Sequence, residues 1–107
     1  MVNVYDDDNH VIARVKYNNN LDRWDGQHWT SGGALGIHKG LTRLKNGRFV
    51  LIHGTQWKGD QEGVRDTAKI ISEEEAVQEI LKSGNDELFD KYPTLAHLRK
   101  DPLIEEE

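Results

Sequence analysis

Alternating apolar and polar residues open the chain, at positions 2–5 (VNVY) and 11–17 (VIARVKY). A period of two sends successive side chains to opposite faces of a strand, so both segments are predicted strands. The intervening residues 6–10 (DDDNH) are turn formers and predict a first β-hairpin. Three neighbouring aspartates also suggest a cation site. However, the calcium-loop pattern of alternating ligands, central glycine and distal glutamate is absent, which favours a solvated turn.

A second hairpin is predicted over residues 37–57, where Asn46-Gly47 separates two largely apolar arms. Asn-Gly is typical of a two-residue type I′ turn, because both residues tolerate a positive φ. The apolar run 49–52 (FVLI) indicates a central strand that is covered on both faces. We expect Phe49 and Leu51 to be buried on the face that meets the helices.

Helical spacing of apolar residues marks the last third of the chain, after a predicted short strand at 69–71. Ser72 followed by Glu75 is a capping box, which predicts that a helix begins there. Gly84 is expected to end this helix, and Asn85 to cap the next. Pro93 is expected to end or kink that second helix.

Together these elements predict an α+β domain. A small antiparallel sheet of about four or five short strands, with the central hairpin 37–57, packs against two or three C-terminal helices. Residues 1–101 are expected to form a single domain, and residues 102–107 an acidic tail. The polar segment 18–36 is predicted to be a long loop with one short helical turn at 21–24. Loops of this length are uncommon in compact domains unless they have a function.

The chain of 107 residues carries a net charge of −5 and no cysteine. Disulfides, thiolate metal sites and cysteine nucleophiles are therefore excluded, and the composition favours the cytoplasm. The N-terminus lacks a signal-peptide pattern, and no apolar run approaches the roughly 20 residues that span a bilayer, so no membrane association is expected. The central hairpin is basic, but the acidic balance of the whole chain argues against a nucleic-acid partner.

Tryptophan is the main candidate for recognition. Trp24 and Trp29 lie in the long polar segment, and Trp57 lies at the end of the central strand. Indoles with a few polar neighbours suit binding surfaces, whereas the alternative is that they pack a core otherwise short of aromatic residues. Trp24 is expected to be exposed, because its neighbours are all polar or turn-forming, namely Asp22, Arg23, Asp25 and Gly26.

Histidine is the second candidate. With a two-residue turn, His53 would face Gly40, so His38 and His53 would share one face, and Gly40 would leave space for a ligand. Two imidazoles are able to hold a metal or supply a general base. A three-residue turn with a glycine bulge would instead place them on opposite faces. No metal-ligand spacing and no serine in a catalytic context is present, so structural histidines are favoured. No catalytic residue, metal ligand or cofactor is assigned.

The sequence therefore favours a small non-catalytic binding or regulatory module that acts on another macromolecule, in the style of an inhibitor, immunity-type or mobile-element accessory protein. A protein is the expected partner. The expected binding residues are Trp24, Trp29, His38, His53 and Trp57. The first alternative is a small-molecule-binding protein with a pocket walled by the Trp24/Trp29 loop and the His38/His53 strands. The second is a minor metal- or histidine-dependent enzyme. The sequence leaves the oligomeric state open.

Overall fold

The structure is a computed structural model that describes residues 1–24, 26–31, 37–55 and 66–99. The strands are β1 (Val2–Tyr5), β2 (Val11–Val15), β3 (Arg23–Trp24), β4 (Trp29–Thr30), β5 (Ile37–Arg43), β6 (Phe49–Thr55) and β7 (Thr67–Ile71). The helices are α1 (Glu73–Ser83), α2 (Glu87–Lys91) and α3 (Pro93–Leu98). Trp57 and the predicted acidic tail 102–107 lie outside the described residues.

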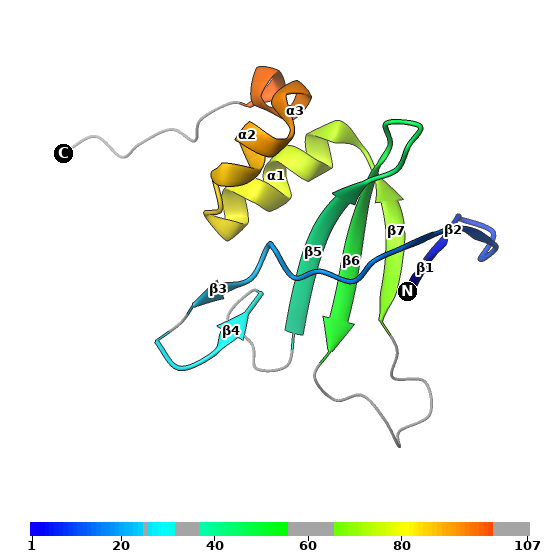
Figure 1. Ribbon diagram of the computed structural model, residues 1–107, viewed down its shortest axis with the longest axis horizontal. Coiled ribbons are helices and arrows are strands. Elements are labelled where there is room, and N and C mark those ends of the chain that lie inside the picture. The colour runs from blue at the N-terminus through cyan, green and yellow to red at the C-terminus, as the bar shows by residue number, and fades with distance from the viewer. Residues whose placement is uncertain (25, 32–36, 56–65, 100–107) are drawn as a thin grey trace.

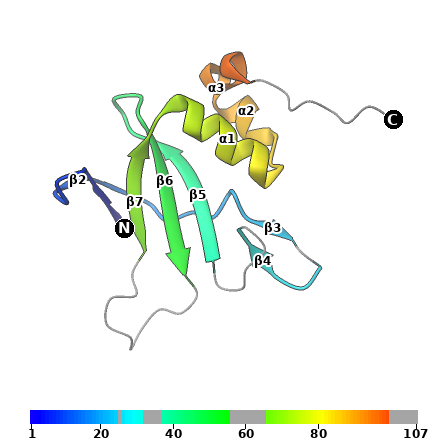
Figure 2. The same ribbon diagram turned by 180° about the vertical axis from the view of Figure 1, so that it is seen from behind.

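The main sheet has five strands in the order β2-β1-β7-β6-β5, and β3 pairs with β4 in a separate two-stranded sheet. The predicted α+β class is confirmed. The sheet is mixed, however, because β1 runs parallel to β7 while the other neighbours are antiparallel. A hairpin turn in the sequence predicts only an antiparallel pair of strands. The parallel contact between β1 and β7 therefore could not be predicted from the turns. Figures 1 and 2 show the helices at one end of the sheet. The β3–β4 hairpin lies beside β5, and the β1–β2 hairpin forms the opposite edge of the sheet. None of the described helices is long and apolar enough to cross a membrane.

The register of the β5–β6 hairpin differs from the expected one. Lys39 faces His53, and Leu44 N–H donates to the Arg48 carbonyl, so the turn has three residues and not two. Gly47 supplies the positive φ of 89° that a glycine bulge requires. Because strand side chains alternate, this one-residue slip places His38 and His53 on opposite faces. The expected shared histidine face is therefore wrong.

Two hydrophobic clusters cover the two faces of the sheet. Phe49 and Leu51 belong to the cluster beneath the helices, as predicted, together with Ile80 and Leu95 from α1 and α3. The opposite face carries a smaller cluster. Its buried members are Val2, Val4, Val15, Val50, Ile52 and Ala68. The continuous apolar run in β6 thus serves both clusters, which confirms that β6 is covered on both sides.

The helix ends follow the sequence signals with one exception. The Ser72 hydroxyl accepts a hydrogen bond from the Glu75 N–H at 3.1 Å, and Gly84 ends α1 with a φ of 75°. α3 begins at Pro93, and the single residue Tyr92 separates it from α2. Asn85 does not cap α2. Its side-chain amide instead donates to the Asn20 carbonyl at 2.8 Å, joining the α1–α2 turn to the segment before β3.

Candidate functional site

The short hairpin formed by β3 and β4 carries two tryptophans and is called the tryptophan hairpin below. Trp24 and Trp29 face each other across its two strands, where a helical turn had been expected at 21–24. Their ring centroids lie 5.6 Å apart at an angle of 51°. Trp24 is 54% exposed and Trp29 57% exposed, so neither belongs to the core. The expected exposure of Trp24 is confirmed, and Trp29 shares it.

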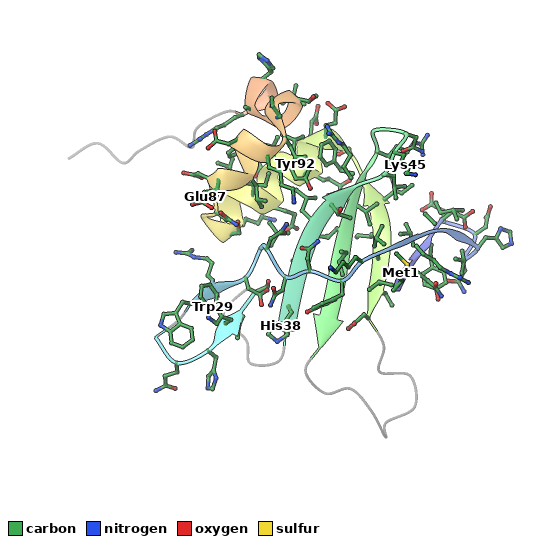
Figure 3. All side chains as sticks on the ribbon, viewed as in Figure 1. Met1, Trp29, His38, Lys45, Glu87 and Tyr92 are labelled. Atoms are coloured by element: carbon green, nitrogen blue, oxygen red, sulfur yellow. The ribbon has the colours of Figure 1, made fainter. Side chains whose placement is uncertain are left out.

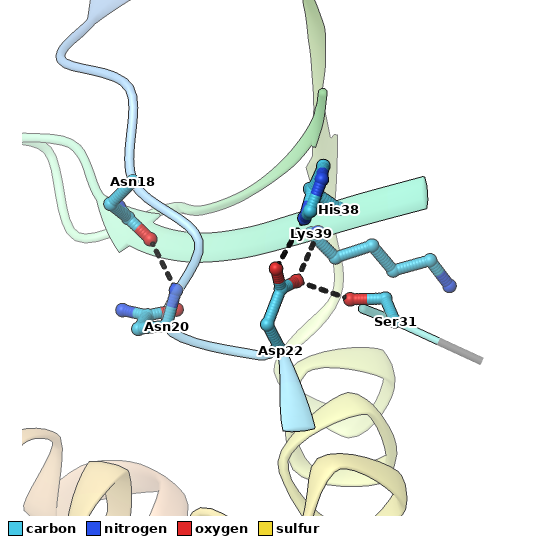
Figure 4. Close-up of polar contacts among 6 residues, drawn as sticks. All are labelled: Asn18, Asn20, Asp22, Ser31, His38 and Lys39. Carbon is cyan, nitrogen blue, oxygen red and sulfur yellow. Dashed lines mark hydrogen bonds and ion pairs between the residues drawn. The ribbon is translucent and has the colours of Figure 1, made fainter. Parts of the chain in front are cut away.

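The tryptophan hairpin is held at its base by the carboxylate of Asp22, whose side chain is only 1% exposed. Figure 4 shows its three partners. The Ser31 hydroxyl donates at 2.7 Å and the Lys39 backbone N–H at 3.0 Å, both to Oδ1, while His38 Nδ1 lies 2.5 Å from Oδ2. A buried carboxylate requires such partners, because its desolvation is costly. Asp22 therefore links the end of β4 to β5.

The chain that enters the tryptophan hairpin is also bonded along the outer edge of β5. The Asn20 side chain acts like a strand residue, since its oxygen accepts from the Leu41 N–H at 2.7 Å and its nitrogen donates to the Leu41 carbonyl at 2.9 Å. The Leu21 N–H donates to the Lys39 carbonyl at 3.1 Å. These bonds satisfy backbone groups that an edge strand would otherwise leave open.

The space beside Gly40 is filled by the protein itself. A Cβ atom at this position would lie 2.1 Å from the Asn18 carbonyl oxygen. Glycine is thus required because the segment after β2 crosses β5 at close range, as Figure 1 shows. The expected ligand space at Gly40 is absent, which removes one support for a metal or ligand between the histidines.

An open cleft of about 540 Å³ lies between the tryptophan hairpin and the turn that joins α1 to α2. Its walls include Trp24 and Trp29 on one side, and Asp86 and Glu87 on the other. Arg23 also lines it, beside Gly84. Figure 3 shows the labelled side chains of Trp29 and Glu87 on this side of the molecule. The cleft therefore combines two aromatic faces with charged groups of both signs.

His38 is a structural partner of Asp22 in this arrangement. Its Nδ1 faces the carboxylate, which fixes the ring orientation and leaves Nε2 as its second polar atom. Ser31 donates to Asp22 and not to His38, so the three side chains do not form a Ser–His–Asp relay. Sequence reasoning missed Asp22 and Ser31, because both lie in a polar segment that gave no sign of burial.

His53 lies apart from the tryptophans. It lines a different cleft, of about 450 Å³, with Tyr5, Asn9, Thr67 and Lys69 among its neighbours. Burial lowers the pKa of His53 from its ordinary 6.5, and the nearby charges of Lys39 and Lys69 lower it further, while Glu79 acts in the opposite direction. The imidazole is therefore held in its neutral form more strongly than an exposed histidine.

The aspartates of the first turn behave as turn residues. Asp6 Oδ1 accepts from the backbone N–H of Asp8 at 3.0 Å and of His10 at 2.8 Å, and these bonds close the turn. Ligand atoms of Asp6, Asp8 and His10 lie within 4.8 Å of one another. Exposed acidic groups often gather in this way without a metal, and we assign none here.

The five sequence-predicted binding residues are only partly brought together. The rings of Trp24 and Trp29 pack against each other, and His38 is connected to the base of their hairpin by its contact with Asp22. His53 belongs to the second cleft, and Trp57 lies outside the described residues. Comparison with known proteins adds no relative to this picture: no family model, curated protein or solved structure matches the chain.

Proposed function

We propose that this protein is a small non-catalytic binding module that recognises another protein through the tryptophan hairpin. The observation that carries the proposal is the pair of Trp24 and Trp29, which are each more than half exposed and whose tilted rings pack against each other. Tryptophan is enriched among the residues that dominate binding energy at protein interfaces. The absence of cysteine is consistent with a partner in the cytoplasm.

The exposed indole area gives a scale for the binding energy. A tryptophan buries about 150–250 Å² when fully covered. Covering the exposed half of both rings at about 25 cal/mol per Å² would contribute on the order of 5 kcal/mol before the costs of association. Two residues are therefore sufficient to act as the energetic centre of an interface.

The Asp22 hydrogen bonds support the proposal because they fix the base of the tryptophan hairpin before any partner arrives. Ser31 and Lys39 bind the same carboxylate from β4 and β5. Asn20 and Asn85 tie the incoming chain to the sheet and to the α1–α2 turn. A surface that is ordered in advance loses less conformational entropy on binding. These hydrogen bonds therefore support a recognition surface that is fixed in advance.

The adjoining cleft favours a protein over a small ligand. It is open and has charged residues of both signs at its walls, namely Arg23, Asp86 and Glu87. Small-molecule sites are usually more enclosed and mostly apolar. A side chain from a protein partner would enter this cleft while the partner's surface covers the indoles. The alternative of one pocket shared by tryptophans and histidines gains no support, because Trp24 and Trp29 line one cleft and His53 lines another.

The proposal is tested by affinity capture from native lysate with the wild-type chain, Trp29→Ala, and Ile12→Ala. Ile12 is the matched control, since it is an exposed apolar residue on β2, at the opposite edge of the sheet. We expect a partner that wild type and Ile12→Ala retain equally and that Trp29→Ala loses. Removing a central indole should weaken binding by about 2 kcal/mol or more.

The same capture experiment also shows when the proposal fails. Equal retention of every captured protein by wild type and Trp29→Ala would overturn the proposal. Circular dichroism of Trp29→Ala accompanies the capture, and we expect its melting curve to match that of wild type.

A further inference from the structure

The second cleft is lined by residues near the end of β6 and the start of β7. Figure 1 shows these strand ends at the end of the sheet farthest from the helices. Tyr5 is paired with Lys69 across the parallel β1–β7 contact, and His53 is paired with Thr67 across β6 and β7. Paired strand residues share a face, so these four side chains belong to the face that the helices cover farther along. None of the four is buried, which leaves their polar atoms accessible to a ligand.

The polar side chains around this cleft have one property in common: each is able to donate a hydrogen bond. They are the Tyr5 hydroxyl, the Asn9 amide, the His53 imidazole, the Thr67 hydroxyl and the Lys69 ammonium group. Among the residues that the structure describes, no carboxylate lines the cleft. A set of donors that includes one fixed positive charge and no negative charge is suited to an oxyanion and unsuited to a metal ion.

The charges around His53 have the sign that an anion requires. Lys39 lies directly opposite His53 on β5, and Lys69 lies diagonally on β7. Glu79 of α1 offsets part of this charge, but its Oε2 lies 3.6 Å from Lys39 Nζ and is paired there. Lys69 makes no ion pair with any residue that the structure describes. A bound anion would therefore gain an unpaired ammonium group without displacing an existing carboxylate.

We propose that this cleft binds a small phosphate monoester, with Lys69, Thr67 and His53 donating hydrogen bonds to the phosphate oxygens. The volume of about 450 Å³ exceeds what a phosphate group needs and falls within the range of small-ligand sites. The Tyr5 ring supplies apolar surface for the organic part of the ligand. This site is separate from the tryptophan hairpin, and its ligand is independent of the proposed protein partner.

The test is an NMR titration of the whole chain with phenyl phosphate and, in parallel, with acetate, at a constant ionic strength of about 0.1 M. We expect saturable shifts of the amide signals of Thr67 and Lys69. The bound dianion should also raise the pKa of His53, because it counters the lysine charges. Acetate should bind more weakly. Acetate binding as tight as that of phenyl phosphate would contradict the assignment to phosphate.

Two lysine variants separate a site from a general attraction of anions. Lys69→Gln should weaken phenyl phosphate binding about tenfold, the loss of one charge-assisted hydrogen bond. Lys45→Gln removes the same charge from an exposed position in the turn at the other end of the β5–β6 hairpin and should leave binding unchanged. Equal affinity of the two variants, or the absence of any saturable shift at His53 in the wild-type chain, would overturn the proposal.

Discussion

Replacing Asp22 by alanine should destabilise the protein strongly, because it removes the acceptor that joins β4 to β5. Three donors lose their partner: the Ser31 hydroxyl, His38 Nδ1 and the Lys39 backbone N–H. A buried donor without an acceptor costs about 1–3 kcal/mol. The hydroxyl and the imidazole are able to turn toward water, whereas the backbone N–H cannot. We therefore expect a total loss of about 3 kcal/mol in the free energy of unfolding.

Ser31→Ala gives an internal check on this magnitude. It removes one hydrogen bond to the carboxylate but leaves Oδ1 bonded to the Lys39 N–H, so about 1.5 kcal/mol should be lost. Asp7→Ala is the matched control, because Asp7 is an exposed aspartate in the first turn. Its substitution should change stability by less than about 0.5 kcal/mol.

Urea denaturation followed by circular dichroism measures all three variants. With a slope of about 2 kcal/mol per M, the loss of 3 kcal/mol lowers the midpoint for Asp22→Ala by about 1.5 M. A midpoint within about 0.25 M of that of Asp7→Ala would refute the reasoning. It would mean that the three hydrogen bonds only balance the cost of burying the carboxylate.

Three further substitutions test other parts of the structure. Ser72→Ala should lower the free energy of unfolding by about 1 kcal/mol in urea, because the Glu75 N–H loses its acceptor; an unchanged midpoint would contradict the cap. Gly40→Ala should lower the melting temperature, since its methyl group would collide with the Asn18 carbonyl; wild-type stability would contradict the crossing of the chain at β5. The folded state holds the pKa of His53 below its ordinary 6.5, so the unfolded chain binds this proton more readily. Stability should therefore fall as the pH drops from 7 through 6.5 toward the lower folded-state pKa, and His53→Gln should reduce this fall; identical pH profiles for both proteins would contradict the effect.

Local signals predicted much of the fold. Ser72 and Gly84 mark the ends of α1 because each satisfies backbone groups within its own turn, and such effects depend only on neighbouring residues. Phe49 and Leu51 were identified as core residues from strand alternation alone. Asn85 shows the limit of this approach. Its sequence context favours a helix cap, but its side-chain amide instead donates a hydrogen bond to the carbonyl of Asn20, which is distant in sequence.

The site was harder to predict because it depends on contacts between distant residues. Asn46-Gly47 suits both a two-residue and a three-residue turn, and the difference decides the faces of His38 and His53. Asp22 and Ser31 have the sequence context of ordinary loop residues. Their burial and their hydrogen bond depend on the packing of this segment against β5. The exposure of Trp24 was predictable from its polar neighbours, whereas its contact with Trp29 required the pairing of β3 with β4.

The central claim is that the two exposed indoles serve recognition and not folding. Its most direct test measures two free energies for Trp24→Ala: that of unfolding in urea, and that of binding to the protein retained in the capture experiment. Because Trp24 is 54% exposed, we expect the unfolding free energy to change by less than about 1 kcal/mol and binding to weaken by about 2 kcal/mol or more. A loss of about 3–5 kcal/mol in stability with unchanged affinity would contradict the account, because that is the behaviour of a core tryptophan.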